Sequence, residues 1–132
     1  MEKRWTHSNK ATYNIGYHLI WCPKYRRKVL IGEIGIRLKE LLNEKSVQLG
    51  LSIENLEVMP DHVHCFIKAS PVDSPHFIVQ QLKGYTSRIL RQEFKQLKSK
   101  LPTLWTRSYY CESVGHISEE VVKKYIMEQK NK

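Results

Sequence analysis

The sequence has little of what marks a disulfide-bonded or membrane protein. Its 132 residues include three cysteines, Cys22, Cys65 and Cys111, which are widely spaced and form no CxxC pair. A disulfide framework and a zinc ribbon are therefore not supported, and a reducing cytoplasm is the expected location. The opening residues, MEKRWTHSNK, have no apolar core, and no run approaches the ~20 apolar residues that span a membrane.

Acidic residues are also scarce. Thirteen Asp and Glu stand against 22 Lys and Arg, which gives a formal net charge of +9 and a pI near 9.5. An excess of positive charge on a small surface attracts polyanions, so nucleic acid is a natural partner. Many soluble proteins are basic without binding nucleic acid, so the charge alone does not establish such a partner.

Repeats and low-complexity tracts are absent as well. Hydrophobic residues make up 41% of the chain and charged residues 27%, which is ordinary for a globular protein. The length fits one domain with a single core, so residues 1–132 are expected to form one catalytic or binding unit.

The first half of the chain predicts a strand, a helix and a hairpin. Side chains alternate with period two from Tyr13 to Cys22, which predicts a strand that Pro23 ends. Apolar residues then recur at helical spacing over 34–50, with Gly50 as the natural C-cap. Two β-prone runs, 51–59 and 62–69, flank the turn pair Pro60-Asp61 and predict an antiparallel hairpin.

The second half predicts a long helix, a strand and a terminal helix. Ser74-Pro75 is an N-cap and N1 pair that opens a helical stretch closed by Pro102, with a possible bend at Gly84. Residues 107–115 form a strand candidate, and residues 118–130 a final helix whose charges suit its dipole. The order β-α-β-β-α-β-α predicts an α+β fold: a small antiparallel sheet with helices on one face, ferredoxin-like or RRM-like.

His62 and His64 are the first candidate site. On a strand, residues two apart share a face, so both imidazoles can reach one ion while Val63 points the other way. An isolated HxH pair more often makes structural hydrogen bonds, so the pair alone leaves both possibilities open.

The terminal helix carries the second candidate site. Val121, Tyr125 and Gln129 step by four and share a helix face, with Val122 and Ile126 forming an adjacent apolar stripe that can dock on the sheet. A lone Tyr-x3-Gln is usually packing, so this pattern too is weak by itself.

Together, HVH on a strand and Tyr-x3-Gln on a C-terminal helix resemble the single-tyrosine HUH transposases, the TnpA-type enzymes of insertion sequences that transpose as single-stranded DNA. The similarity extends to YHLIWCPKYRRKVL, MPDHVHCFIKA, LKGYTSRILRQEF and LWTRSYYCESVGHISEEVVKKYIMEQ, in that family's order. The conjunction covers almost the whole chain, and it is far more specific than either motif.

The resemblance implies a mechanism. Tyr125 would attack a DNA phosphodiester and form a 5′-phosphotyrosine, while His62, His64 and Gln129 would bind a divalent cation, Mg²⁺ or Mn²⁺. Imidazole alone would equally suit zinc, so the metal follows from the family and not from the ligands. Asp61 is interpreted as a turn residue and His18 as a strand histidine.

The resemblance also implies partners. Members recognise hairpins in single-stranded DNA near the ends of their element and work as homodimers, in which the helix bearing the tyrosine can complete the active site of the partner subunit. The segment SVGHISEE is a plausible hinge for such a trans site, but the sequence alone leaves cis and trans assembly open. Only Lys130, Asn131 and Lys132 follow Gln129, so contacts made by a longer tail do not carry over.

Basic residues indicate where DNA would bind. One cluster lies in the loop after the first strand and the other forms a stripe along the second helix; charges interleaved with aromatics suit single strands. The stripe could equally be a solvated helix face. The candidates are Lys24, Tyr25, Arg26, Arg27 and Lys28 in the loop, and Arg88, Arg91, Lys95 and Lys98 in the stripe.

Two alternatives remain open at this point. A relative that binds hairpin DNA or RNA without cutting would use the same sheet and loop, although the intact candidate residues argue against it. A zinc protein using Cys65 or Cys111 with the histidines is disfavoured, because Cys65 points to the face opposite His62 and His64.

Overall fold

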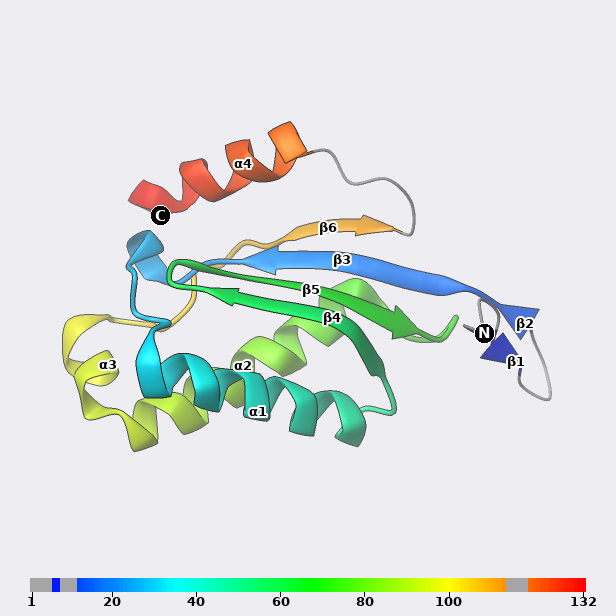
Figure 1. Ribbon diagram of the computed structural model, residues 1–132, viewed down its shortest axis with the longest axis horizontal. Coiled ribbons are helices and arrows are strands. Elements are labelled where there is room, and N and C mark those ends of the chain that lie inside the picture. The colour runs from blue at the N-terminus through cyan, green and yellow to red at the C-terminus, as the bar shows by residue number, and fades with distance from the viewer. Residues whose placement is uncertain (1–5, 8–11, 114–118) are drawn as a thin grey trace.

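A computed structural model describes residues 6–7, 12–113 and 119–132 of the chain, shown in Figure 1. The strands are β1 (Thr6–His7), β2 (Thr12–Tyr13), β3 (Ile15–Trp21), β4 (Ser52–Met59), β5 (His62–Ala69) and β6 (Tyr110–Ser113). The helices are η1 (Lys24–Arg26), α1 (Gly32–Gln48), α2 (Pro75–Glu93), α3 (Lys95–Lys100), α4 (Glu119–Glu128) and η2 (Gln129–Asn131). Within these described ranges, no helix is long and apolar enough to cross a membrane.

Four strands form one antiparallel sheet in the order β4-β5-β3-β6. Both strands of the predicted hairpin flank the Pro60-Asp61 turn, and β3 lies between β5 and β6. This order is that of the ferredoxin-like arrangement, so the predicted α+β fold is confirmed. The short pair of β1 and β2 was not predicted, because two residues carry too little pattern.

The hydrophobic core lies between the sheet and the helices α1 and α2, which share one face of it (Figure 1). Alternate residues of β3 and β5 point into this layer, because successive strand side chains face opposite ways. Its fully buried members include Leu19 and Trp21 of β3, Val63 and Ile67 of β5, Leu38, Leu41 and Leu42 of α1, and Ile78, Leu82 and Leu90 of α2.

Helix α4 lies on the opposite face of the sheet, over β6 and β3 (Figure 1). The prediction that the helices pack on one face therefore holds for α1 and α2, and it is wrong for α4. Ile20, near the end of β3, projects to this second face and is completely buried, so this face is covered there. The predicted cap Ser118 lies outside the described residues.

Two helix ends have the local chemistry that the sequence predicts. Gly50 adopts a positive φ of 73° after α1, and the amides of Gly50 and Leu51 bond back to the carbonyls of Val47 and Ser46, as in a Schellman motif. Ser74 caps α2, because its hydroxyl accepts a hydrogen bond from the Phe77 amide at 3.1 Å.

The helical stretch predicted up to Pro102 is interrupted at Phe94 and not at Gly84, which lies inside a continuous α2. Phe94 has extended backbone angles, φ −121° and ψ 90°. The change of direction allows Leu97 and Leu101 to reach the core, where both are buried. Burial of these two side chains favours the break over a longer straight helix.

Thr86 of α2 provides a test of this packing. Its buried hydroxyl accepts a hydrogen bond from the indole N–H of Trp105 at 3.1 Å, which ties α2 to the segment that leads into β6. Thr86→Val keeps the shape but leaves the indole donor unpaired, so we expect a loss of about 1–3 kcal/mol in the free energy of unfolding. Urea denaturation measures this loss, and Ser99→Ala, at an exposed position, is the control. An unchanged midpoint would show that the bond does not stabilise the fold.

Candidate active site

His62 and His64 lie on β5 and project to the face of the sheet that α4 covers. Both are half-buried, whereas Val63 between them is fully buried in the core on the other side. The alternation predicted from the sequence is therefore present, and the two imidazoles share one face.

Asp61 orients the first imidazole. Its Oδ1 lies 2.9 Å from Nδ1 of His62, and its Oδ2 lies 3.4 Å from Nε of Arg26. A carboxylate at this distance holds the proton on Nδ1 and leaves the lone pair of Nε2 free, which is how ligand histidines are commonly supported. Asp61 is in the predicted turn, and its side chain also links that turn to η1.

His64 lies beside a third histidine. Its Nε2 is 3.4 Å from Nδ1 of His18 on β3, and the His18 ring also lies 4.6 Å from the ring of Phe66. Burial lowers the pKa of His64, so at neutral pH its imidazole is uncharged, as a metal ligand must be. Among the residues that the structure describes, no three His, Cys, Asp or Glu side chains form a group that could hold a metal ion.

Tyr125 and Gln129 meet at a common partner, Ser108. The Ser108 hydroxyl lies 2.9 Å from Oε1 of Gln129 and 3.1 Å from the hydroxyl of Tyr125. An amide oxygen only accepts, so Ser108 donates its single proton to Gln129 and accepts the proton of Tyr125. The predicted shared orientation of the two side chains is therefore observed.

The phenol of Tyr125 is poorly acidic where it lies. Burial raises its pKa to about 12, although the hydroxyls of Ser108 and Thr106 oppose this shift. Its ring packs at a centroid distance of 5.9 Å from that of Tyr110. Tyr125 is thus a neutral, positioned hydroxyl at physiological pH.

Lys83 of α2 holds the segment that carries Ser108, the partner of Tyr125 and Gln129. Its ammonium donates to the main-chain carbonyls of Thr106 at 2.6 Å and Ser108 at 3.1 Å. Burial lowers the pKa of Lys83 to about 8. The segment that bears Ser108 is therefore anchored to α2 through the edge of the core.

The histidine pair, His62 with His64, and the pair of Tyr125 with Gln129 lie on the same face of the sheet but over different strands. His64 is paired with Ile20, Ile20 is paired with Tyr110, and Tyr110 contacts Tyr125. Two strand spacings separate β5 from β6, which is ~10 Å. The structure thus brings Tyr125 together with Gln129, and His62 with His64, on one surface with β3 between them.

Comparison with known proteins decides the family. Residues 11–129 match the family described as "Transposase IS200 like". The chain belongs to this family. It is 41% identical over 122 residues to the ISDra2 transposase TnpA of Deinococcus radiodurans, covering 91% of this chain and 87% of that protein. It is 32% identical over 123 residues to the IS200 transposase of Salmonella typhimurium, with 89% and 78% covered.

Solved structures agree with this assignment. A crystal structure of a candidate transposase from Deinococcus radiodurans superposes with a TM-score of 0.84 at 35% identity, covering 94% of this chain and 97% of that one. A REP-associated tyrosine transposase bound to a REP hairpin has a TM-score of 0.57 at 12% identity, covering 84% and 61%, and this likeness shows the fold. The suspected resemblance to the single-tyrosine HUH transposases is confirmed.

The cysteines of this transposase do not join the histidines. Cys65 is buried on the core face, where burial raises the pKa of its thiol to about 12, and Cys111 is exposed on the edge strand β6. All three cysteines are free thiols. The alternative of a Cys/His zinc site built on Cys65 is therefore wrong, because the sheet separates its sulfur from both imidazoles.

The basic loop of the transposase lies at the same end of the sheet as the end of α4 (Figure 1). The Tyr25 amide donates to a main-chain oxygen of Lys132 at 2.7 Å, and the ammonium of Lys24 lies 5.2 Å from the Tyr25 ring centroid. Tyr25 and Arg26 have positive φ angles of 58° and 50°, which cost non-glycine residues energy and often mark functional segments. Arg27 and Lys28 are exposed beside them.

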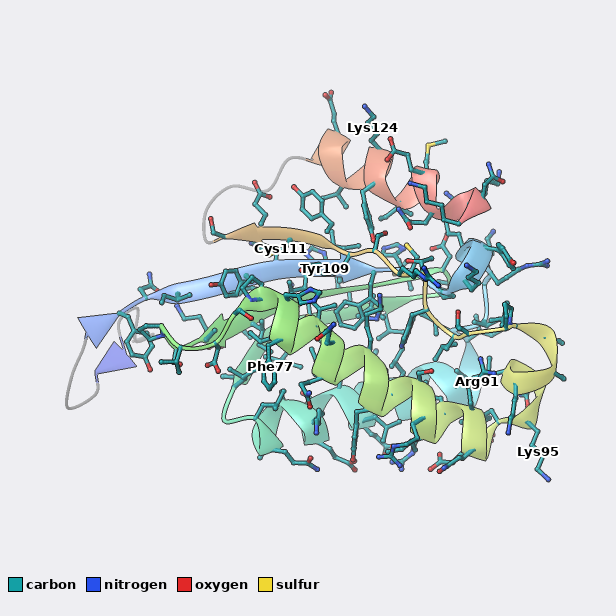
Figure 2. The ribbon with its side chains drawn as sticks, turned by 180° about the vertical axis from the view of Figure 1, so that it is seen from behind. Phe77, Arg91, Lys95, Tyr109, Cys111 and Lys124 are labelled. Atoms are coloured by element: carbon teal, nitrogen blue, oxygen red, sulfur yellow. The ribbon has the colours of Figure 1, made fainter. Side chains whose placement is uncertain are left out.

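The helical stripe lies elsewhere. Figure 2 shows Arg91 and Lys95 on α2 and α3, on the side of the sheet away from α4 and its Lys124. Arg91 donates to the Leu101 carbonyl at 3.3 Å, and Arg88 lies over the Tyr85 ring. The structure does not bring this stripe to the histidines, and its contact with DNA stays a prediction.

Sequence reasoning missed several residues of this site, namely His18, Ser108, Thr106 and Lys83. Each is brought there by pairing between distant segments, and serine, threonine and lysine are too common in loops to stand out. The proposed hinge SVGHISEE falls largely on 114–118, outside the described residues.

Proposed function

We propose that this transposase cleaves and rejoins single-stranded DNA through a 5′-phosphotyrosine at Tyr125, with a divalent cation held at His62 and His64. The carrying observation is that one face of the sheet holds both a pair of imidazoles, one oriented by Asp61 and the other kept uncharged by burial, and a half-buried tyrosine hydroxyl that is hydrogen-bonded to Ser108. Family membership supports a DNA transfer reaction.

The tyrosine accounts for both halves of the reaction. Its Oη forms a bond to phosphorus, the bond from phosphorus to the 3′ oxygen breaks, and the phenol proton leaves as the 3′-OH gains one. The ester keeps the energy of the broken bond, so a 3′-OH can attack it and restore a phosphodiester. No nucleotide cofactor is needed. Burial raises the pKa of Tyr125 to about 12, so the phenol must be activated before it can attack.

The residues present fit a divalent cation. The lone pair of His62 is directed by Asp61, and His64 is neutral. Gln129 would be the third ligand, and its oxygen would then exchange the hydrogen bond from Ser108 for the cation. With neutral ligands, a bound Mg²⁺ or Mn²⁺ would supply nearly its full charge to polarise the scissile phosphate.

Hairpin recognition and dimerisation complete the proposal. The solved transposase with the same fold is bound to a REP hairpin, which supports a hairpin as the DNA partner here. The imidazoles lie on β5, whereas the tyrosine packs against Tyr110 of β6, and the reaction needs both groups at one phosphate. A homodimer in which α4 of each subunit serves the partner's histidines would bring them together, and so would a shift of α4. Free thiols are in keeping with work in the cytoplasm.

A cleavage assay tests the proposal. The protein is incubated with labelled single-stranded hairpins that carry flanking single strands, with matched duplexes, and with Mg²⁺, Mn²⁺ or excess chelator. We expect a protein–DNA adduct on a denaturing gel only with single strands and metal. Tight hairpin binding without an adduct under every condition would favour a non-cutting DNA- or RNA-binding module.

A further inference from the structure

A small basic cavity adjoins the tyrosine. It has a volume of about 220 Å³, and it is lined mainly by the carbon atoms of basic and other polar residues, with no Asp or Glu among them. Its lining residues are Lys24, Thr106, Arg107, Ser108, Gln129 and Lys132. Three of these are cations, and each comes from a different segment: η1, the connection before β6, and the chain after η2.

Main-chain hydrogen bonds hold these segments together. The Lys24 amide donates to the Leu104 carbonyl at 2.8 Å, and the Tyr25 amide donates to a main-chain oxygen of Lys132 at 2.7 Å. Arg107 and Lys132 are exposed and Lys24 is half-buried, so water screens the repulsion among their charges. Three positive side chains at one cavity nevertheless favour an anion there.

The cavity is continuous with the candidate nucleophile. Ser108 and Gln129 line it, and the same Ser108 hydroxyl contacts the hydroxyl of Tyr125. Ser108 alone would therefore connect an occupant of the cavity to the hydroxyl of Tyr125, the atom proposed to attack DNA.

We propose that this cavity binds a backbone phosphate of the DNA strand that Tyr125 attacks. The inference rests on the proposed function, and it adds Arg107 and Lys132 as residues that hold the strand beside the tyrosine. A guanidinium can donate two parallel hydrogen bonds to a phosphate, and an ammonium adds a point charge. The site would fix the position of the DNA strand relative to Tyr125.

Binding to tailed and blunt hairpins tests this site. Arg107→Gln and Lys132→Gln, each in a Tyr125→Phe background that prevents cutting, are compared on hairpins with and without a single-stranded tail. Each should weaken binding of the tailed hairpin about fivefold at 0.1 M salt and lower the slope of log K against log salt by ~0.7, the value for one phosphate contact on a single strand. Binding of the blunt hairpin should not change.

Two controls make the comparison specific. Lys39→Gln removes one exposed positive charge from α1, on the other side of the sheet, and should leave the tail's contribution unchanged. Arg107→Lys keeps the charge and should recover most of the lost affinity. Tail phosphates are also replaced one at a time by neutral methylphosphonates. One replacement should cost the parent protein the same fivefold and cost Arg107→Gln nothing further.

The outcomes separate this inference from the proposed function. Suppose that the Tyr125→Phe protein binds tailed hairpins and wild type forms the adduct, but that Arg107→Gln and Lys132→Gln bind the tailed hairpin as tightly as Lys39→Gln does. The phosphate site is then wrong and the mechanism stands. If the slope falls and the methylphosphonate effect disappears as expected, the site is established even where no adduct forms. A protein with no affinity for the tail overturns the phosphate site outright.

Discussion

Tyr125→Phe should eliminate the covalent protein–DNA adduct and reduce strand cleavage by more than about a thousandfold, because it removes the only atom proposed to bond to phosphorus. The phenyl ring can keep its packing against Tyr110, and Ser108 can keep its bond to Gln129. The fold and the affinity for hairpins should therefore change little. Denaturing gels measure the adduct, and gel shifts measure the binding.

Tyr110→Phe is the matched control for this substitution. Tyr110 lies against Tyr125, and its hydroxyl donates to Glu112 at 3.2 Å, so the change removes a neighbouring phenol hydroxyl from the same face. We expect the control to cut within a fewfold of wild type. An adduct that persists in Tyr125→Phe and is lost in Tyr110→Phe would show that the nucleophile is Tyr110 and not Tyr125.

His62→Ala and His64→Ala should each abolish metal-dependent cleavage to the level seen with chelator. Each removes one of the two imidazoles that share a face of β5, and the remaining ligands would hold a cation weakly. Calorimetric titration with Mn²⁺ provides a readout besides activity. Its binding enthalpy should be lost with either variant and kept with Tyr125→Phe.

His76→Ala controls for the loss of a surface histidine. His76 is exposed on α2, where its Nδ1 lies 3.1 Å from the Tyr109 hydroxyl, and it takes no part in the candidate site. This variant should bind Mn²⁺ and cut as wild type does. Undiminished cutting by His62→Ala in excess chelator would remove the cation from the mechanism.

The sequence predicted most of the fold because its periodicity changes clearly between elements. Alternation predicted β3, the Pro60-Asp61 turn placed the hairpin of β4 and β5, and Ser74-Pro75 placed the start of α2. The face covered by α4 could not be predicted in this way. The apolar stripe of Val122 and Ile126 predicts that the helix packs against another element, but it does not specify which face of the sheet the helix contacts.

The candidate site was predicted where a motif is local and missed where contacts are long-range. His62 with His64, and Tyr125 with Gln129, lie two and four residues apart, so strand and helix geometry relates them directly. Ser108 is 17 residues from Tyr125, and His18 is 46 from His64. Their roles follow from the pairing of β3 with β5 and β6, which residue spacing alone does not specify.

Mapping the attachment point of DNA tests the central claim most directly. Wild type is incubated with a 5′-labelled single-stranded hairpin and Mn²⁺, the adduct is digested with nuclease and protease, and the modified peptide is sequenced by mass spectrometry. The mechanism predicts a nucleotide joined through its 5′ phosphate to Tyr125, with a free 3′-OH on the released strand. Attachment to another residue, or cleavage without any attachment, would contradict it.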